Sequence, residues 1–500
     1  MVALSDDPQH LNPVITTQGG VHTASRLLYN GLVELGPNLE PVPDLAEWWE
    51  VEEDGRLYRF RLREDVVWHD GTPFTSADVK YTFEEVLLKY HSRARASLGT
   101  VLESIDVPDE RTVVFRFREP YAPFLQQLDV HEAAILPKHR FEGTDPLTNP
   151  ANFAPIGTGP FRFERHVPDV EIRYAANERY HEPGLPRLGR IVMRVIPDRG
   201  SQVLALEAGE VDWLYGVPGP DRARLEREGF RFLRSGIGPG GSNCIMTLSF
   251  NLDRPMFRDV RFRRAVAHAI DREQFLERIL FGQGRVADAP ISSGIPFAHA
   301  SGLAMPEHDP ARSRLLLEEL GWRPAEDGRR VARGVEGVPD GTPLRFTFHH
   351  FPSFGAYGEL LRAQLRQVGI DLALRPLDPP IFVEDVFRDR AFDMNVVSYC
   401  NSTDPEVGVR RMYVSSNIAP IPFSNASAYR NSTVDSLFDM ARRTMDAAGR
   451  GEIYREIQEI LVEELPYFWL VETESVRVYR PGCSGFTVYG HFAEAASCDP

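Results

Sequence analysis

Cysteine is scarce in this 500-residue chain: it occurs four times, and no two cysteines stand in a CxxC pair. Four cysteines are too few for a disulfide scaffold, and their spacing excludes a zinc ribbon or a thioredoxin motif. Long apolar runs are lacking as well. Nowhere do about 18 apolar residues follow one another, so no segment is expected to span a bilayer.

Positive charge is outnumbered by negative charge. The chain has 56 Lys and Arg against 72 Asp and Glu, a formal net charge of −16, so it would repel nucleic-acid backbones and anionic lipid. We expect no nucleic-acid partner. With 42% hydrophobic and 26% charged residues the composition is that of an ordinary folded protein. At roughly 100 to 200 residues per domain, the length indicates about three structural units.

A secretory signal is also missing from the amino terminus. Residues 1–8, MVALSDDP, contain neither a basic segment nor an apolar stretch of about 7 to 15 residues. Two interpretations follow from these residues alone: the protein is cytoplasmic, or its signal sequence is absent from this sequence.

Diagnostic motifs for metal or cofactor chemistry are scarce too. HExxH is absent, and neither His131 with His139 nor the pair at 349–350 has the spacing of a metal site. Residues 236–241 spell GxGxxG, but residues 244–251 read as a strand, whereas a dinucleotide site requires a helix there. We therefore expect a glycine-rich turn, and no catalytic residue, metal or cofactor.

Residues 45–90 have the pattern of a hairpin followed by a helix. Apolar residues alternate on both sides of Asp54 and Gly55, which are a strong turn signal. Thr75 and Asp78 then have capping-box spacing, and the apolar residues after them recur at helical intervals. The pattern predicts two antiparallel strands and a helix that begins there.

From residue 344 onwards, strand-like runs alternate with helical ones. Strands are expected at 344–350, 370–374 and 392–399, and helices at 361–368 and 381–390. This βαβαβ order predicts a parallel sheet, in which ligands lie outside the carboxyl ends of the strands. Two amphipathic helices should follow, at 434–445 and 453–461. Residues 323–343, rich in Gly, Pro and charge, are predicted to be an exposed loop.

A run of motifs resembles a known family along almost the whole chain. Residues 43–79, PDLAEWWEVEEDGRLYRFRLREDVVWHDGTPFTSADV, resemble the signature region of the extracytoplasmic solute-binding proteins of family 5, the oligopeptide-, dipeptide- and nickel-binding components of ABC transporters. Further landmarks follow in family order: LLYNGL (27–32), IGTGPFRF (156–163), ALEAGEVD (205–212), FNLDRPMFRDVRFRRAVAHAIDRE (250–273), HDPARSRLLLEELGW (308–322) and YREIQEILVEELP (454–466).

The resemblance implies an α/β fold of the periplasmic-binding-protein class, a two-lobe clamp with an extra inserted domain and mixed sheets flanked by helices. The boundaries that it predicts are lobe I at 1–35, the inserted domain at 36–155, lobe I again at 156–245, lobe II at 246–477 and a return to lobe I at 478–500.

The same resemblance implies a function. The chain would capture a peptide-like or other small polar solute between two lobes and deliver it to the permease subunits of an ABC importer. It would not be an enzyme and would not alter the solute chemically. Ligand-induced closure would signal occupancy. The resemblance also implies a monomer in the periplasm or extracytoplasmic envelope, with the signal sequence removed. The alternative is that the same fold binds an opine, a sugar or a nickel chelate.

Candidate ligand residues come from both lobes. In peptide-binding relatives an aromatic residue is followed three positions later by an aspartate that pairs with the peptide's amino terminus; here Tyr399 is followed by Ser402, so the charge is missing. Asp404, before Pro405, fits a helix cap better than an ammonium partner. The ligand candidates are Tyr29, Asn30, His350, Tyr399, Cys400, Asn401, Ser402 and Arg410, with Arg411 beside it as a possible anion clamp.

The cysteine pairing is left open by the sequence. Cys483 and Cys498 would close a short loop worth about 3 kcal/mol in an oxidising envelope. Cys244 with Cys483 is a second possibility, and free thiols are the third.

Two functions of other classes remain as alternatives. A hydrolase that uses carboxylates or histidines of the cleft would convert its ligand, although no motif supports it. A receptor whose closed form signals to a membrane sensor would share every motif with a transport protein.

Overall fold

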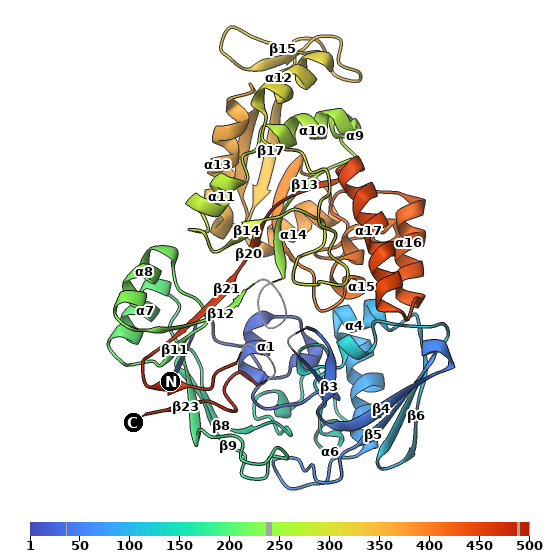
Figure 1. Ribbon diagram of the computed structural model, residues 1–500, viewed down its shortest axis with the longest axis vertical. Coiled ribbons are helices and arrows are strands. Elements are labelled where there is room, and N and C mark those ends of the chain that lie inside the picture. The colour runs from blue at the N-terminus through green and yellow to red at the C-terminus, as the bar shows by residue number, and fades with distance from the viewer. Residues whose placement is uncertain (37, 237–242, 488–490, 500) are drawn as a thin grey trace. The chain divides into compact units, whose positions relative to one another are not determined.

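The computed structural model describes residues 1–36, 38–236, 243–487 and 491–499. By its contacts the chain divides into two compact units (Figure 1): unit 1 comprises 1–241, 442–445 and 475–500, and unit 2 comprises 242–441 and 446–474. Each unit contains a mixed sheet with helices, which confirms the α/β two-lobe fold class. The five predicted segment boundaries stay a prediction; residues 36–155 belong to unit 1 by their contacts.

The main sheet of unit 1 draws its strands from both ends of the chain. In sheet order they are β12 (Arg231–Gly236), β21 (Ser475–Tyr479), β11 (Trp213–Leu214), β1 (Val2–Leu4), β10 (Arg190–Val195), β9 (Glu171–Ala176) and β8 (Phe161–Val167). β1 runs parallel to β10 and β11, whereas β21 is antiparallel to β11 and β12. The carboxyl-terminal segment therefore returns to the unit in which the chain begins.

A second, antiparallel sheet of unit 1 contains the predicted hairpin. Its order is β4 (Ala46–Glu52), β5 (Leu57–Leu62), β7 (Thr112–Phe117) and β6 (Leu102–Asp109). Trp49 lies opposite Phe60 across the first pair, which confirms the hairpin. α2 (Ser76–Tyr81) begins with the predicted capping box between Thr75 and Asp78, and continues through a wider turn into α3 (Leu88–Tyr90).

Two of the sequence landmarks meet in unit 1 through glycine. Gly159 N–H donates to the carbonyl of Leu28 at 2.9 Å, and Phe161 N–H donates to that of Leu27 at 3.0 Å. A Cβ added to Gly157 would lie 1.7 Å from the Leu28 oxygen, so only glycine permits this approach. The IGTGPF motif is thus a backbone docking element for LLYNGL.

The sheet of unit 2 contains the predicted βαβαβ segment. Its order is β14 (Gly284–Val286), β20 (Tyr467–Thr473), β13 (Cys244–Phe250), β19 (Met394–Cys400), β17 (Arg345–His350) and β18 (Asp371–Pro376). β17 is parallel to both β18 and β19, as predicted. α13 (Gly355–Arg366) and α14 (Pro379–Val383) connect these strands. β13 confirms the strand expected after the glycine-rich run, whose residues 237–241 lie outside the described ones.

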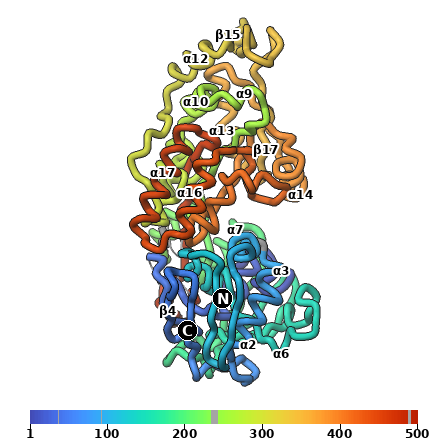
Figure 2. The backbone as a smooth tube through the Cα atoms, turned by 90° about the vertical axis from the view of Figure 1, so that its right-hand side faces the viewer, coloured from blue at the N-terminus to red at the C-terminus, as the bar shows by residue number. Residues whose placement is uncertain are grey.

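The predicted pair of late helices is present as α16 (Ser432–Arg443) and α17 (Ala447–Glu464), which lie beside each other in both views (Figures 1 and 2). The remaining helices are α1 (Gly19–Ser25), α4 (Ser92–Ser97), α5 (Val130–Ala133), α6 (Lys138–Phe141), α7 (Arg199–Glu207) and α8 (Gly219–Arg227) in unit 1, and α9 (Pro255–Arg258), α10 (Val260–His268), α11 (Glu273–Arg278), α12 (Pro310–Glu319) and α15 (Pro405–Gly408) in unit 2. Short pairs are β2 (Val33–Leu35) with β3 (Pro41–Pro43) and β22 (Cys483–Ser484) with β23 (Ser497–Cys498).

The prediction of an exposed loop over 323–343 is wrong in part. β15 (Trp322–Pro324) and β16 (Arg330–Ala332) form a small hairpin there. Arg330 is only 3% exposed, because its guanidinium donates to the carbonyls of Val368 (2.8 Å) and Trp322 (2.7 Å). Tertiary hydrogen bonds thus order a segment whose local composition is typical of a loop.

Phe115 should be among the most sensitive core positions of unit 1. Its buried ring lies 5.0 Å from that of Phe83 and 4.8 Å from that of Phe124, centroid to centroid. We expect Phe115→Ala to destabilise unit 1 by about 3 to 5 kcal/mol, through lost burial and the cavity left behind. Denaturant unfolding measures this, with Phe153→Ala as the control because that ring is exposed. Equal losses in the two variants would contradict the packing described.

Candidate functional site

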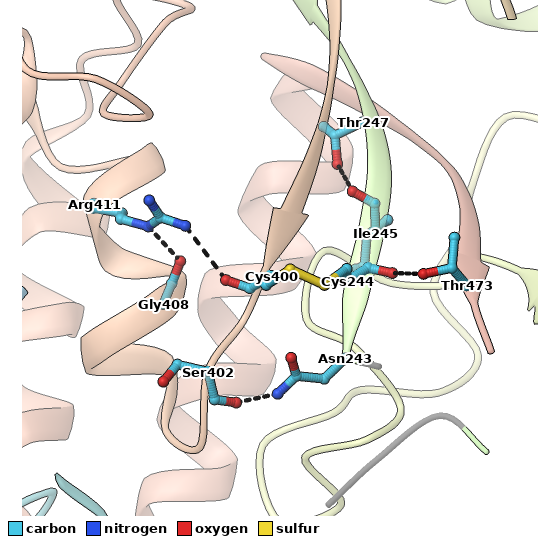
Figure 3. The surroundings of a disulfide bond; sticks show 9 residues. All are labelled: Asn243, Cys244, Ile245, Thr247, Cys400, Ser402, Gly408, Arg411 and Thr473. Atoms are coloured by element: carbon cyan, nitrogen blue, oxygen red, sulfur yellow. Dashed lines mark hydrogen bonds between the residues drawn. A yellow bond between two sulfur atoms is a disulfide. The ribbon is translucent and has the colours of Figure 1, made fainter. Parts of the chain in front are cut away.

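The carboxyl end of β19 is clasped to β13 by a disulfide. Cys244 lies directly opposite Cys400 in the antiparallel register, and their sulfurs are bonded (Figure 3). The suggested Cys244–Cys483 pair is therefore wrong, because β13 presents Cys244 to β19. The Cys483–Cys498 bridge is confirmed, between β22 and β23. All four cysteines lie in the described ranges and all four are bonded, so the free-thiol reading is wrong too.

The turn after β19 is held by neighbours on several sides. Asn401 N–H donates to the carbonyl of Asn243 (3.1 Å), and Asn401 Oδ1 accepts from Ser292 N–H (2.6 Å). The side-chain amide of Asn243 donates to the carbonyl of Ser402 (Figure 3). The backbone of Ser402 has a left-handed φ of 56°. A Cβ on Gly408 would lie 2.1 Å from the Asn401 carbonyl, so this position also requires glycine. Asn401 is buried and Ser402 is half-buried.

Tyr399 is enclosed within unit 2. The side chain is 1% exposed, and burial raises the pKa of its hydroxyl well above the ordinary value, so the group is neutral. The Arg411 guanidinium lies 5.8 Å from the ring centroid and donates to the carbonyls of Gly408 (3.0 Å) and Cys400 (3.4 Å). Arg411 thus contacts both the Tyr399 ring and the backbone around the turn.

Asp404 is committed to an internal ion pair. Its carboxylate accepts from Glu406 N–H at the start of α15, which confirms the predicted cap, and both its oxygens lie within 2.9 Å of Arg450 Nη2. Both side chains are buried. Burial alone would lower the pKa of Arg450, but the Asp404 carboxylate and the Tyr454 hydroxyl together outweigh it and raise that pKa. Asp404 is therefore not a free counter-charge for a ligand ammonium.

Arg410 is similarly engaged. Its guanidinium donates to Asp439 Oδ1 at 2.8 Å and lies 3.5 Å from Glu406 Oε2. His350, at the end of β17, is 3% exposed; Nδ1 donates to the carbonyl of Phe351 (2.8 Å), while the buried Nε2 has no hydrogen-bond partner among the described residues. The contact of Arg410 and of His350 with a ligand stays a prediction.

The two candidates from the first lobe lie in the interior of unit 1. Tyr29 is 1% exposed and Asn30 is fully buried. The Asn30 amide donates to Asp44 Oδ1 (2.9 Å) and to His491 Nε2 (3.0 Å), and Asn30 Oδ1 accepts from Thr158 Oγ1 (3.0 Å). Burial lowers the pKa of His491 to about 4, so its ring is a neutral acceptor. Asn30 thus organises a buried polar network, and its contact with ligand stays a prediction.

The same region of unit 1 concentrates buried carboxyl groups. Burial and the neighbouring Asp44 charge raise the pKa of Glu34 to about 7. Burial and the charges of Glu34 and Asp44 raise the pKa of Glu494 to about 8. Arg26, 6% exposed, opposes this negative charge. Perturbed groups of this kind occur at functional sites and in structural networks alike.

Two clusters were missed by sequence reasoning. His22 lies between His91 and His131 in unit 1, with ring centroids 6.3 and 6.4 Å apart, whereas His139 instead bonds Asp70 at 2.8 Å. In unit 2 the side chains of Asp288, His299 and Glu472 converge. No local spacing could have revealed either cluster, because tertiary structure brings distant segments together.

Comparison with known proteins decides the family. A family model described as "Bacterial extracellular solute-binding proteins, family 5 Middle" matches residues 40–420. The chain belongs to this family.

Similar proteins of this family cover nearly the whole chain. A putative ABC transporter peptide-binding protein of Brucella suis is 27% identical over 478 residues, 92% of this chain and 84% of that protein. NikA from Brucella suis, in a complex with Fe(III)-EDTA, superposes with a TM-score of 0.84 at 26% identity, covering 98% of this chain and 97% of NikA. AppA from Bacillus subtilis, in a complex with a nonapeptide, has a TM-score of 0.80 at 24% identity, with 99% and 96% covered.

Family membership settles the class of function. This family 5 protein is a solute-binding component of an ABC importer, and the family acts outside the cytoplasm. Its relatives are binding proteins of transporters. No helix in the described part of the chain has both the length and the apolar character to cross a bilayer.

The ion pair at the cap of α15 should matter for the stability of unit 2. Asp404→Ala leaves the buried Arg450 guanidinium without its carboxylate, so we expect a loss of about 3 to 5 kcal/mol in the free energy of unfolding. Denaturant unfolding measures the loss. Asp327→Ala is the matched control, because Asp327 is exposed and bonds the side chain and the backbone N–H of the nearby Arg329, so its removal should change stability little. Similar values for both variants would contradict a buried pair.

The two disulfides should differ in their contributions to the free energy of unfolding. Cys244 and Cys400 are 156 residues apart, Cys483 and Cys498 only 15, so the loop-entropy model assigns about 5 and 3 kcal/mol respectively. Paired Cys→Ser variants of each bridge, compared by denaturant unfolding, test the order. We expect the larger loss for the 244/400 variant, in unit 2; a larger loss for 483/498 would contradict the model.

Proposed function

We propose that this protein captures a small polar solute, peptide-like or of similar size, and releases it unaltered to the permease of an ABC importer. The observation that carries the choice of ligand is the neutral character of the turn after β19. Ser402 stands where peptide-binding members of the family place an aspartate, and the nearby Asp404 is neutralised by Arg450. Neither of these two residues therefore supplies a free carboxylate for a ligand ammonium.

The ligand that suits such a turn has no free amino terminus at this position. Burying an ammonium without a counter-charge would cost several kcal/mol. The turn instead offers amide, hydroxyl and backbone groups, which bind neutral polar atoms. Blocked peptides, or peptides bound in another register, therefore fit it better than free peptide amino termini.

A metal chelate is the second candidate ligand. NikA, which resembles this chain in fold and sequence, is known in a complex with Fe(III)-EDTA. In this chain the buried Nε2 of His350, which has no hydrogen-bond partner among the described residues, provides a nitrogen ligand at a strand end. Opines and sugars are further solutes that the neutral turn could accommodate.

Membership of the family supports the proposed location and partners. Two disulfides support an oxidising compartment, since such bonds persist in the periplasm or on the cell surface. We propose that the native protein is exported by a signal sequence that is then removed, and that it acts as a monomer in the cell envelope. No cofactor is required for capture and release.

A ligand panel tests the proposal. Free peptides, N-acetylated peptides, opines, sugars and metal chelates are compared by their effect on the thermal unfolding midpoint. A ligand at about 100 times its Kd should stabilise the protein by about 2.7 kcal/mol. We expect a shift from at least one class, with N-acetylated peptides at least equal to free ones.

Two variants test whether the ligand binds at the turn after β19. Ser402→Arg should abolish most of the shift, whereas Ser416→Arg, at an exposed position of unit 2, should leave it unchanged. Mass spectrometry should recover the ligand intact. The proposal fails if no class moves the midpoint of the folded protein, if both variants behave alike, or if the ligand is recovered as a product.

A further inference from the structure

Three side chains of unit 2, each of a type that can ligate a metal, converge on one another. Asp288 and His299 come from the long segment after β14, and Glu472 comes from β20. One ligand atom of each lies within 4.8 Å of the others. Among the described residues, no other group of three or more such side chains converges this closely.

The hydrogen bond of His299 defines its tautomer. Nδ1 lies 2.8 Å from the carbonyl oxygen of Ile291, which can only accept, so Nδ1 carries the proton. In a neutral ring Nε2 is then a bare lone pair. It lies 3.5 Å from Asp288 Oδ1, which is also an acceptor. A cation between these two facing acceptors would satisfy both of them.

The carboxylate of Glu472 is held in place before any cation arrives. The side chain is fully buried, and its oxygens accept from Ser293 Oγ (2.6 Å), Ser293 N–H (3.2 Å) and Ser292 Oγ (3.3 Å). These donors fix the orientation of the carboxylate, as outer partners do for metal ligands.

The carboxylate of Asp288 is divided between two roles. Oδ2 accepts from Arg285 at 2.5 Å, while the buried Oδ1 has no hydrogen-bond partner among the described residues. Arg272, the other cation nearby, donates to the carbonyls of Ala287 and Trp469. With Arg285 and Arg272 counted, the two carboxylates are balanced in charge, so what favours a cation is this Asp288 Oδ1 atom, which faces His299 Nε2.

We propose that Asp288, His299 and Glu472 bind a divalent cation of the borderline class, for which Zn²⁺ is the probe. One imidazole and two carboxylates form a set that zinc accepts, with water as the fourth ligand. Zinc bonds of about 2.0 to 2.2 Å place tetrahedral ligand atoms roughly 3.3 to 3.5 Å apart. The Nε2 to Oδ1 distance of 3.5 Å already matches that edge.

The site goes beyond solute capture, because the ion would be a resident of unit 2 and not the transported solute. It also has a route to the β19 turn. Ser292, whose hydroxyl bonds Glu472, donates its N–H to Asn401 Oδ1 at 2.6 Å. An ion that orders the Asp288–His299 segment would therefore help to hold Asn401.

Metal content tests the site in tag-free protein, stripped with EDTA and then exposed to Zn²⁺. After gel filtration, elemental analysis should find about one zinc per chain. His299→Gln should lower the affinity more than about tenfold, and Asp288→Asn should do so too. His308→Gln, with a side chain 39% exposed in the same unit, is the matched control and should bind as wild type does.

Stability gives an independent readout. Zinc should raise the thermal midpoint of the wild type and of the His308 variant, but not that of folded His299→Gln. Asp288→Asn provides the answer if the His299 variant does not fold. No retained zinc in the wild type, or equal retention in all variants, would overturn the proposal.

Discussion

The antiparallel pairing of β13 with β19 is the constraint on which the organisation of unit 2 depends. It runs in register from Cys244 opposite Cys400 to Phe250 opposite Met394. β13 also pairs with β20, and β19 with β17, so this pair joins the antiparallel and parallel halves of one sheet. Because the disulfide closes the pair at its end, the turn at Asn401 and Ser402 begins from a position that cannot slide.

Polar groups near this turn are mostly satisfied within the protein. Asp404 is paired with Arg450, Arg410 with Asp439, and Arg411 with backbone carbonyls. Charges with such partners hold the shape of the turn.

Much of the fold could be predicted, because local signals were strong. The Asp54–Gly55 turn, the Thr75 capping box and the βαβαβ rhythm each predicted elements that the structure contains. The hairpin within 323–343 was missed, since the hydrogen bond that Arg330 donates to the carbonyl of the distant Val368 helps to order it. Of the candidate site, the Asp404 cap was predicted correctly from its place before proline. The burial of Asn30 was not, because its partners Thr158 and His491 are remote in sequence.

The sequence by itself determined the family and the kinds of secondary structure, because motifs, periodicity and residue identity are local properties. Only the tertiary structure decided which cysteine pairs with Cys244, which charges near β19 are already neutralised, and that Asp288, His299 and Glu472 meet. Each of these depends on which strands become neighbours. Neighbours in a mixed sheet are chosen by packing across the whole unit, and no short stretch of sequence records that choice.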